Sequence, residues 1–397
     1  MTERQQEDII VYSTIWCPDC KRAKRFLGEQ RIPYVNVDIE QNAEAMAIVQ
    51  KLNDGKRVIP TIVFPDGSVL VEPSNAELAD KLDLQTSARH SYYDAIVVGG
   101  GPAGLTAALY MARENIETLV IEKGGLGGQA GITNILDNFP GFDEGISGAE
   151  FAERLGRQAR RFDAEILQAQ SVVNIREIGP YLCVTTADGT EYDAKAVLLA
   201  TGARYRRLNV PGEEELLGLN IHFCATCDGA FYRGKKILVV GGGNSGFEEG
   251  IFLTNFARQV DIVEFLPEVR ASSFLQEQAA RNAQVSVITN HGIKAFKGRH
   301  GLEAVVVEDR ATGETKEWEY DGVFVFIGLA PNSNLVEDLV NLDERGFVQT
   351  DQNLMTSAPG LFAAGDVRSG STKQATSAAG EGATAALMIR DYLKRVA

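Results

Sequence analysis

Residues 94–104 read DAIVVGGGPAG, an apolar strand that runs into a G-x-G-x-x-G turn. Residues 236–246 read KILVVGGGNSG and repeat the pattern 142 positions later. In each repeat the glycines let the backbone approach a pyrophosphate, and the helix that follows offers free N–H groups and the positive end of its dipole. The two stretches therefore predict two dinucleotide-binding units of α/β type.

An acidic residue follows each glycine turn at the same distance. Glu122 ends the apolar run LVIE, and Glu264 ends DIVE, again 142 positions apart. A carboxylate at this place can accept a hydrogen bond from a ribose 2′-hydroxyl. The alternative, two ordinary βαβ glycine turns without a nucleotide, would not require acidic residues at matching distances. The nucleotide-contacting candidates are Gly99, Gly101, Pro102, Ala103, Gly104 and Glu122 in the first unit, and Gly241, Gly243, Asn244, Ser245, Gly246 and Glu264 in the second.

Two C-x-x-C pairs, Cys17–Cys20 and Cys224–Cys227, contain four of the five cysteines. Each pair can store two electrons by alternating between disulfide and dithiol. The rival interpretation is a four-cysteine zinc site. Because each pair lies in its own α/β unit, a shared zinc site is disfavoured and no metal is expected. Cys183 lies in an apolar run and is expected to be buried in a strand.

The first 84 residues form a separate pattern. Strand and helix signals alternate in the order βαβαββα, which predicts a small α/β domain over residues 1–84. The polar stretch 85–92 fits a linker. Strands are expected at 9–12, 34–37, 62–64 and 69–71, and helices at 18–29, 43–52 and 75–82.

Composition limits the partners. A formal net charge of −15 over 397 residues argues against nucleic acid and anionic membranes, because phosphate binding needs a basic face. The N-terminus lacks the order of a secretory signal, and the most apolar stretch, 95–112, is interrupted by glycines. We expect a cytoplasmic protein, in which a C-x-x-C pair is typically catalytic or metal-binding.

From residue 93 onward the chain resembles low-molecular-weight thioredoxin reductase and the reductase half of the alkyl hydroperoxide reductase flavoprotein. The motifs that carry the resemblance are 99–104, Gly127-Gly128-Gln129, Asn138-Phe139-Pro140-Gly141, 200–203 (ATGA), 224–229 (CATCDG), Gly365-Asp366 and Lys373-Gln374-Ala375. The resemblance implies an FAD domain in two parts (93–207 and 329–397), split by an NAD(P) domain (208–328), and a homodimer.

The same resemblance implies roles for single residues. Asp366 would hold the flavin ribityl chain and Gln374 would lie near the ring. Cys227 would face the flavin, Cys224 would attack the external disulfide, and Asp228 would manage the thiol protons, although a cap is the simpler role for that aspartate. The further FAD contacts that it implies are Gly128, Gln129, Asn138, Thr201, Gly202, Gly365, Lys373 and Ala375.

The N-terminal domain resembles glutaredoxins, and most closely mycoredoxin, which implies a thioredoxin fold ahead of two Rossmann-like three-layer domains. The resemblance rests on residues 16–20 (WCPDC), 37–40, 58–61 (VIPT), 66–68 and 73–74. It implies that Pro60 is a cis proline facing the cysteines. Residues 72–74 read EPS where glutaredoxins carry a Gly-Gly pair, which weighs against glutathione as the thiol partner.

The expected helix assigns different roles to the two cysteines of the N-terminal domain. Cys17 is expected at the N-terminus of a helix, where the dipole stabilises a thiolate, so it is the exposed nucleophile and Cys20 the more buried resolving thiol. Lys21 is expected beside the active site, whereas Lys24 and Arg25 fit a solvated helix face equally well.

The nicotinamide is predicted to be NADH. NADPH-dependent thioredoxin reductases carry a His-Arg-Arg run at this strand end, whereas here Glu264 would repel a 2′-phosphate. Arg270, which matches the last basic residue of that run, leaves NADPH as the less favoured choice. Electrons would pass from NADH through FAD to Cys224–Cys227, then to Cys17–Cys20 and on to an outside disulfide.

Two alternatives stay open. The chain could be an alkyl hydroperoxide reductase flavoprotein that reduces a peroxiredoxin, although that family carries a double thioredoxin-like unit at its N-terminus. The N-terminal domain could instead carry an iron–sulfur cluster, against which the resolving Cys20 argues. The final acceptor, a low-molecular-weight thiol disulfide or a redox protein, is not fixed by the sequence. Nor is it fixed whether the N-terminal domain serves its own or a partner subunit.

Overall fold

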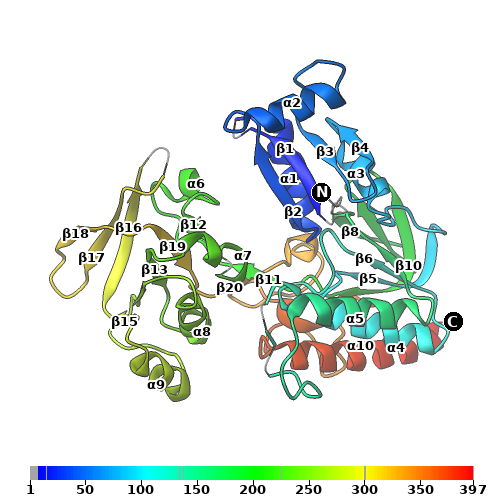
Figure 1. The fold of residues 1–397 in the computed structure, drawn as a ribbon. Helices are drawn as coiled ribbons and strands as arrows, with labels where there is room; N and C mark the ends of the chain where they lie inside the picture. Colours follow the sequence, from blue (N-terminus) through cyan, green and yellow to red (C-terminus); the bar gives the residue numbers. More distant parts are fainter. Residues whose placement is uncertain are drawn as a thin grey trace.

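The computed structural model describes residues 8–14, 16–133, 135–136, 138–223, 225–298 and 301–396, with the backbone alone at Tyr205, Thr226, Cys227 and Ala230. Three bodies are visible in Figure 1. The N-terminal domain stands on one side of a central domain, which contains both early and late parts of the chain. A third domain, formed by the middle of the chain, extends to the side of the central one.

The N-terminal domain has a four-stranded mixed sheet in the order β2-β1-β3-β4. β1 and β2 are parallel, and the β1–β3 and β3–β4 pairs are antiparallel. The expected βαβαββα order is confirmed, with every border within one residue of the prediction. The elements are β1 (Ile9–Ser13), α1 (Pro18–Glu29), β2 (Tyr34–Asp38), α2 (Ala43–Leu52), β3 (Thr61–Val63), β4 (Val69–Val71) and α3 (Asn75–Lys81).

The central domain is built on a seven-stranded sheet. Its order is β7-β6-β5-β10-β9-β8, and β21 also pairs with β10. β21 therefore returns to a sheet that the chain left more than 150 residues earlier. The elements are β5 (Tyr92–Val98), α4 (Pro102–Arg113), β6 (Thr118–Ile121), η1 (Ala130–Ile132), α5 (Gly148–Arg160), β7 (Glu165–Leu167), β8 (Val172–Ile178), β9 (Tyr181–Thr186), β10 (Glu191–Leu199), η3 (Asn334–Val336), β21 (Leu361–Ala363), η4 (Gly365–Val367) and α10 (Ala375–Val396).

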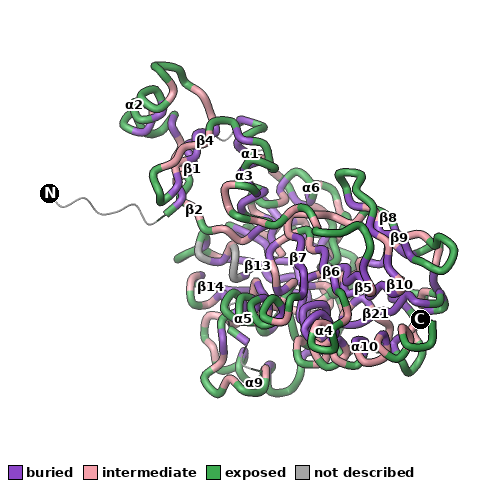
Figure 2. Tube along the Cα trace, turned by 90° about the vertical axis from the view of Figure 1, so that its right-hand side faces the viewer, coloured by how far each residue is buried: buried purple, intermediate pink, exposed green. Residues whose placement is uncertain are grey.

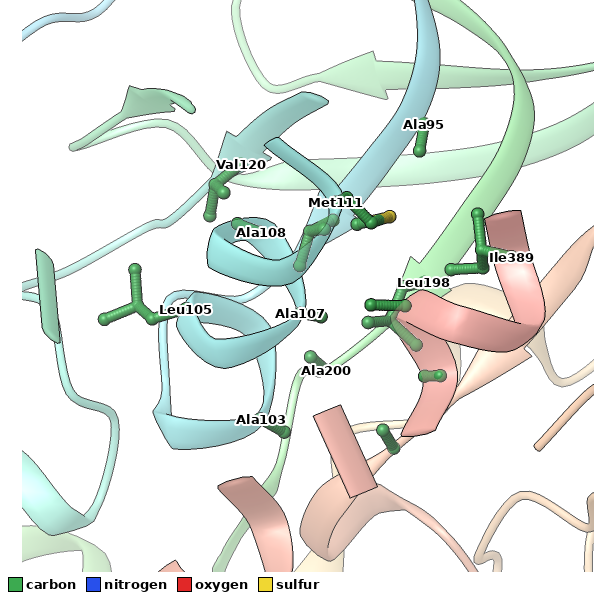
Figure 3. Close-up of a cluster of buried hydrophobic side chains, with 14 of the residues drawn as sticks. Ala95, Ala103, Leu105, Ala107, Ala108, Met111, Val120, Leu198, Ala200 and Ile389 are labelled. Atoms are coloured by element: carbon green, nitrogen blue, oxygen red, sulfur yellow. The ribbon is translucent and has the colours of Figure 1, made fainter. Parts of the chain in front are cut away.

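Small side chains bring α4 and α10 together over this sheet. Figure 3 shows Ala103, Ala107 and Ala108 of α4 among the buried residues of this core, with Ile389 of α10 nearby. A Cβ on Gly382 would lie 2.1 Å from the carbonyl oxygen of Ala103, so only glycine permits this approach. Burial is concentrated in the central strands and in α4 (Figure 2), and Cys183 is fully buried in β9, as expected. The close packing fixes where α4 begins, at the first glycine turn.

The third domain has a five-stranded parallel sheet and a three-stranded antiparallel sheet. Their orders are β12-β19-β13-β14-β15 and β16-β17-β18. The elements are α6 (Glu213–Leu216), β12 (Ile221–His222), α7 (Ala225–Asp228), η2 (Gly229–Tyr232), β13 (Lys236–Val240), α8 (Asn244–Leu253), β14 (Gln259–Val263), α9 (Ser273–Arg281), β15 (Val285–Ile288), β16 (His291–Lys297), β17 (Ala304–Asp309), β18 (Thr315–Trp318) and β19 (Gly322–Val325).

Two short strands connect the central and third domains. β11 (Ala203–Tyr205) and β20 (Leu329–Pro331) pair antiparallel where the chain leaves and re-enters the central domain. Next to them, Thr201 Oγ1 donates to Asn332 O at 2.7 Å and Asn332 Nδ2 donates to Thr201 O at 2.8 Å. The domain borders expected at residues 208 and 328 stay a prediction. Among the helices of the described segments, none is long and apolar enough to cross a membrane.

Candidate functional site

The first glycine turn joins β5 to α4. Gly99 has φ +111°, and a Cβ there would lie 2.3 Å from Ala200 O. A Cβ on Gly104 would lie 1.9 Å from Gly99 O, so this position also requires glycine. α4 begins after Gly101, which provides no side-chain cap. The first-turn N–H groups of α4 are thus left for a ligand, as a pyrophosphate site requires.

The second glycine turn reproduces the first. Gly241 has φ +122°, and a Cβ there would lie 2.2 Å from Phe326 O. A Cβ on Gly246 would lie 1.9 Å from Gly241 O, the same spacing as between Gly104 and Gly99. α8 begins after Gly243, again without a side-chain cap. The repeat seen in the sequence is therefore a repeat of backbone geometry.

Both predicted ribose-binding acids hold their own glycine turns. Glu122 Oε2 accepts a hydrogen bond from Gly100 N at 2.6 Å, and Glu264 Oε2 accepts one from Gly242 N at 2.5 Å. Each second carboxylate oxygen accepts a backbone N–H of the following loop at 2.8 Å, from Gly124 and Leu266 respectively. The acids lie at the turns, as expected, and also order the loop after each strand. Arg270 is exposed, and its backbone N–H donates to Gly242 O at 2.8 Å.

Asp366 lies in η4 with a buried carboxylate. Within the described residues its Oδ1 has no hydrogen-bond partner, and burial raises the pKa of this carboxyl. A buried polar atom without a partner is costly unless a ligand satisfies it. Lys373 Nζ donates to the carbonyl oxygens of Asp366 and Arg368 at 2.7 and 3.1 Å, which fixes the loop that carries Asp366. Asp366 thus fits a hydroxyl-bearing cofactor such as the ribityl chain of FAD.

The start of α10 and the 138–142 segment meet across the same site. Asn138 Nδ2 donates to Gln374 Oε1 at 3.0 Å, and Thr376 Oγ1 donates to Asn138 O at 3.4 Å. The structure thus brings together two predicted FAD contacts that are 236 positions apart. Gly127 and Gly128 lie close to the first turn, since a Cβ on Gly101 would be 3.8 Å from Gly128 Cα.

The loop of Gly365 depends on an acid that the sequence did not single out. Glu381 on α10 forms a bidentate ion pair with Arg368, with distances of 2.7 and 3.1 Å. Its Oε2 also accepts a hydrogen bond from Gly365 N at 2.7 Å. The pair is largely buried. In the sequence, Glu381 was marked only as a charged residue among the small side chains of α10.

The N-terminal cysteine pair is a disulfide. Cys17 and Cys20 are joined with a Cα–Cα distance of 5.3 Å. Cys20 is fully buried, and Cys17, which was expected to be exposed, is only 5% exposed, so that part of the prediction is wrong for the disulfide form. Cys17 is the N-cap of α1, and its Sγ accepts from Cys20 N at 3.0 Å. The Ile59–Pro60 peptide bond is cis, as expected, and Ile59 O lies 3.8 Å from Cys17 Sγ. This geometry places Cys17 where backbone N–H groups stabilise a thiolate.

Basic residues on α1 differ in their surroundings. Lys21, predicted beside the active site, is exposed, and its role there stays a prediction. Lys24, for which a solvated face was equally expected, is half-buried and donates to Ser13 Oγ at 3.4 Å. Burial lowers the pKa of Lys24, although the negative charge of Asp38 acts to raise it. Arg25 is exposed and pairs with Glu29, which agrees with a solvated face.

The second cysteine pair is described only in part. Cys224 lies outside the described residues, and only the backbone of Cys227, in the short helix α7, is described. Asp228 is held by a residue that sequence reasoning missed: His222 Nδ1 lies 3.2 Å from Asp228 Oδ2. His222 Nε2 lies 2.7 Å from the hydroxyl of Tyr232, whose pKa burial raises to about 12. The expected acid is therefore part of a hydrogen-bonded chain.

Comparisons with known proteins agree with this geometry. Residues 93–382 match the family model described as pyridine nucleotide-disulphide oxidoreductase, and residues 9–69 match the glutaredoxin model. Thioredoxin reductase of Bacillus subtilis (strain 168) is 41% identical over 307 residues, which are 77% of this chain and 96% of that protein.

A fused relative and a solved structure extend the likeness. The bifunctional thioredoxin reductase/thioredoxin of Mycobacterium leprae (strain TN) is 43% identical over 313 residues, 79% of this chain and 68% of that protein. The crystal structure of Lactococcus lactis thioredoxin reductase in its FR conformation superposes with a TM-score of 0.74 at 37% identity. The match covers 76% of this chain and 99% of that one.

The chain therefore belongs to the pyridine nucleotide-disulphide oxidoreductases. Within that family it is a flavin disulfide reductase of thioredoxin reductase type, fused to an N-terminal glutaredoxin domain with the thioredoxin fold. The family implies FAD and a pyridine nucleotide as cofactors. The residues present fit them: each glycine turn leaves helix N–H groups for a pyrophosphate, and Oδ1 of Asp366 is buried without a hydrogen-bond partner in the described part of the chain.

Proposed function

We propose that this enzyme uses NADH to reduce disulfides through a relay of its two cysteine pairs, from Cys224–Cys227 to Cys17–Cys20. When bound, FAD takes a hydride from the nicotinamide and passes two electrons to a disulfide. The observation that carries the proposal is the disulfide Cys17–Cys20 at the start of α1, on the same chain as a second C-x-x-C pair whose Cys227 lies in α7. Both pairs fit two-electron exchange.

The outward step depends on the position of Cys17. As a thiolate at the N-terminus of α1 it attacks an external disulfide, forms a mixed disulfide and releases one thiolate. Cys20 then attacks the Cys17 sulfur, which releases the second thiol and closes the Cys17–Cys20 disulfide. The dithiol of Cys224 and Cys227 exchanges with this disulfide and regenerates Cys17 and Cys20. Asp228 accepts and returns the proton of the inner thiol.

Glu264 supports the choice of NADH. Its carboxylate ends β14 and lies against Gly242, where the ribose of a nucleotide on this turn is expected. A 2′-phosphate there would meet this negative charge, whereas a 2′-hydroxyl can donate to it. The exposed Arg270 is the one basic residue of the NADPH pattern in this segment. Assays with each cofactor test this choice, and a clear NADPH preference would contradict it.

The acceptor is a low-molecular-weight thiol disulfide or a disulfide-bearing redox protein. The segment that departs from glutaredoxins, residues 72–74, ends in the N-cap of α3. There Ser74 forms a capping box with Glu77, whose Oε2 accepts from Ser74 N at 2.7 Å and from Ser74 Oγ at 2.8 Å. An acidic carboxylate already occupies this helix end, which supports an acceptor other than glutathione. The enzyme is proposed to act as a homodimer, as the family resemblance of its sequence motifs implies.

One experiment tests the relay. NADH oxidation is followed with a panel of disulfides, using the wild type, Cys17→Ser and Cys183→Ser. Cys17→Ser should lose activity toward every acceptor that needs the glutaredoxin domain, while flavin reduction by NADH stays intact. Cys183→Ser is the matched control, because Cys183 is a buried thiol in β9. Full activity of Cys17→Ser with all acceptors would show that the N-terminal domain takes no part.

A further inference from the structure

The glutaredoxin domain contacts the central domain at the end of α1 opposite to its cysteines. Glu29 O accepts a hydrogen bond from Gly125 N at 2.8 Å, and Gln30 Nε2 donates to Lys123 O at 3.0 Å. α1 has 12 residues and so spans about 18 Å, with Cys17 at the far end. The contact lies on the loop that follows β6 and Glu122 (Figure 1).

Arg31 is the charged residue of this contact. Its guanidinium donates to two carbonyl oxygens of the loop, from Nη1 to Leu126 O and from Nη2 to Gly128 O, the latter at 2.5 Å. Arg31 is half-buried. Burial lowers its pKa, although the negative charge of Glu122 acts to raise it. The planar fork of arginine can serve two acceptors at once, which a lysine does not reproduce.

Peptide geometry shows what these bonds do to the loop. In a trans peptide the C=O and the N–H of one unit point in opposite directions. Leu126 O accepts from Arg31, and the N–H of the same unit, on Gly127, donates the other way to Gly100 O at 2.7 Å. Gly128 O also accepts from Arg31, and the Gly128–Gln129 peptide bond is not cis. The Gln129 N–H therefore points away from Arg31.

That direction leads toward the first glycine turn. The loop packs on this turn, because a Cβ on Gly101 would lie 3.8 Å from Gly128 Cα and one on Gly100 would lie 2.9 Å from Leu126 Cδ2. Gly101 is the N-cap of α4, where the pyrophosphate of a bound dinucleotide is expected. N–H groups turned toward that point add to the anion site of the helix N-terminus.

We propose that Arg31 of the glutaredoxin domain is a positioning residue for the FAD site: it holds the 126–129 peptides so that the Gln129 N–H faces the pyrophosphate. This inference rests on the proposed location of FAD at the first glycine turn. It makes retention of FAD depend on docking of the glutaredoxin domain. Cys17, at the other end of α1, takes no part in the contact.

The test measures FAD release from the full-length enzyme. The rise in FAD fluorescence after dilution gives the release rate for the wild type, Arg31→Ala, Arg31→Lys and Arg25→Ala. We expect release about tenfold faster for Arg31→Ala, an intermediate rate for Arg31→Lys and no change for Arg25→Ala. Arg25 is the matched control because it is an exposed arginine of α1, the helix that Arg31 follows, with a surface ion pair, which contributes little.

A second readout separates positioning from a general loss of stability. The ³¹P NMR signals of the bound pyrophosphate should shift in Arg31→Ala and stay unchanged in Arg25→Ala. Wild-type release and an unchanged ³¹P spectrum for a folded Arg31→Ala would overturn the inference. If Arg31→Ala does not fold, Arg31→Lys decides by the same two measurements. A wild-type enzyme that holds no FAD would instead refute the proposed function.

Discussion

His222 and Asp228 lie in contact across the end of β12 and the helix of the second cysteine pair, with 3.2 Å between Nδ1 and Oδ2. His222 is buried against Phe324 and Tyr232, with ring centroids 5.2 and 5.4 Å away. In one arrangement of the protons, His222 Nδ1–H donates to Asp228 and Nε2 accepts from the Tyr232 hydroxyl, which also has Leu219 O as an acceptor at 3.4 Å. The imidazole therefore sets the orientation of the carboxylate beside Cys227.

Replacing His222 should impair proton handling without removing the cofactor sites. His222→Leu leaves Asp228 without its donor, and we expect disulfide reduction to slow about tenfold near pH 7, because general acid–base catalysis depends on geometry. The pH profile of the rate should also shift. Reoxidation of the reduced enzyme by 5,5′-dithiobis(2-nitrobenzoic acid), followed by stopped flow between pH 5.5 and 9, measures both effects.

His222→Asn provides the control for this prediction. An asparagine amide can reproduce the donor at Nδ1, so this variant should recover most of the wild-type rate. Tyr232→Phe removes the hydroxyl that bonds His222 Nε2 and Leu219 O but keeps the Asp228 contact, so it should have a smaller effect than His222→Leu. Equal rates and pH profiles for His222→Leu and the wild type would show that His222 serves only packing.

The charge of Glu264 can be removed with little change in shape. Glu264→Gln keeps one carbonyl oxygen for the turn, gives up one of the two backbone bonds, and loses the repulsion toward a 2′-phosphate. We expect kcat/KM for NADPH to rise several-fold and kcat/KM for NADH to fall by less than about tenfold, the scale of one charged hydrogen bond. Glu268→Gln, an exposed acid of the same segment, is the control. If the ratio of kcat/KM for NADPH to kcat/KM for NADH is unchanged in Glu264→Gln, Glu264 does not determine the choice of cofactor.

Glu165 anchors the connection between the glutaredoxin and central domains. Its buried carboxylate accepts hydrogen bonds from Gln85 Nε2 at 2.5 Å, from Arg89 N at 2.9 Å and from Tyr93 Oη at 2.7 Å. Glu165→Ala removes the acceptor of the buried Tyr93 hydroxyl together with the bonds to Gln85 and Arg89, and we expect a loss of about 2–4 kcal/mol. Trypsin should then cleave after Arg89 faster than in the wild type. Glu117→Ala, which removes an exposed acid near His90, should leave cleavage unchanged.

Sequence patterns identified features that depend on local geometry. The glycine turns, the acids Glu122 and Glu264 and the cap at Cys17 each follow from a short segment, because one strand–turn–helix unit sets them. The N-terminal elements were equally local, and their borders differ from the prediction by one residue at most. A family resemblance was needed to single out Asp366, which alone is only a polar residue in a glycine-rich loop.

Contacts between distant segments were not accessible in this way. Arg31 follows a helix as one of many surface arginines, and its role depends on a loop nearly 100 positions away. Glu381 and Arg368 meet only because α10 packs against the 365–367 turn. His222 precedes the cysteines and has no spacing that marks it, since its contact with Asp228 is set by the register of β12 on β19. Tertiary packing decides all three.

Glu249 on α8 gives the enzyme a pH-dependent stability. Burial, and next the charge of Glu248, raise the pKa of Glu249 from 4.5 to about 7. Between these two values the folded state binds more protons at Glu249 than the unfolded state, so the contribution of Glu249 to stability falls as pH rises from about 4.5 to about 7 and then stays level. Glu249→Gln removes this loss, and we expect it to be more stable than the wild type above pH 7 by about 1–2 kcal/mol, with no gain below pH 4.5.

Calorimetric Tm differences between variant and wild type at pH 5, 6, 7 and 8 measure the effect. Glu277→Gln, which neutralises an exposed acid on α9, is the control and should give a Tm difference that does not change with pH. A Tm difference for Glu249→Gln that does not grow with pH would place the Glu249 carboxylate in a solvated environment.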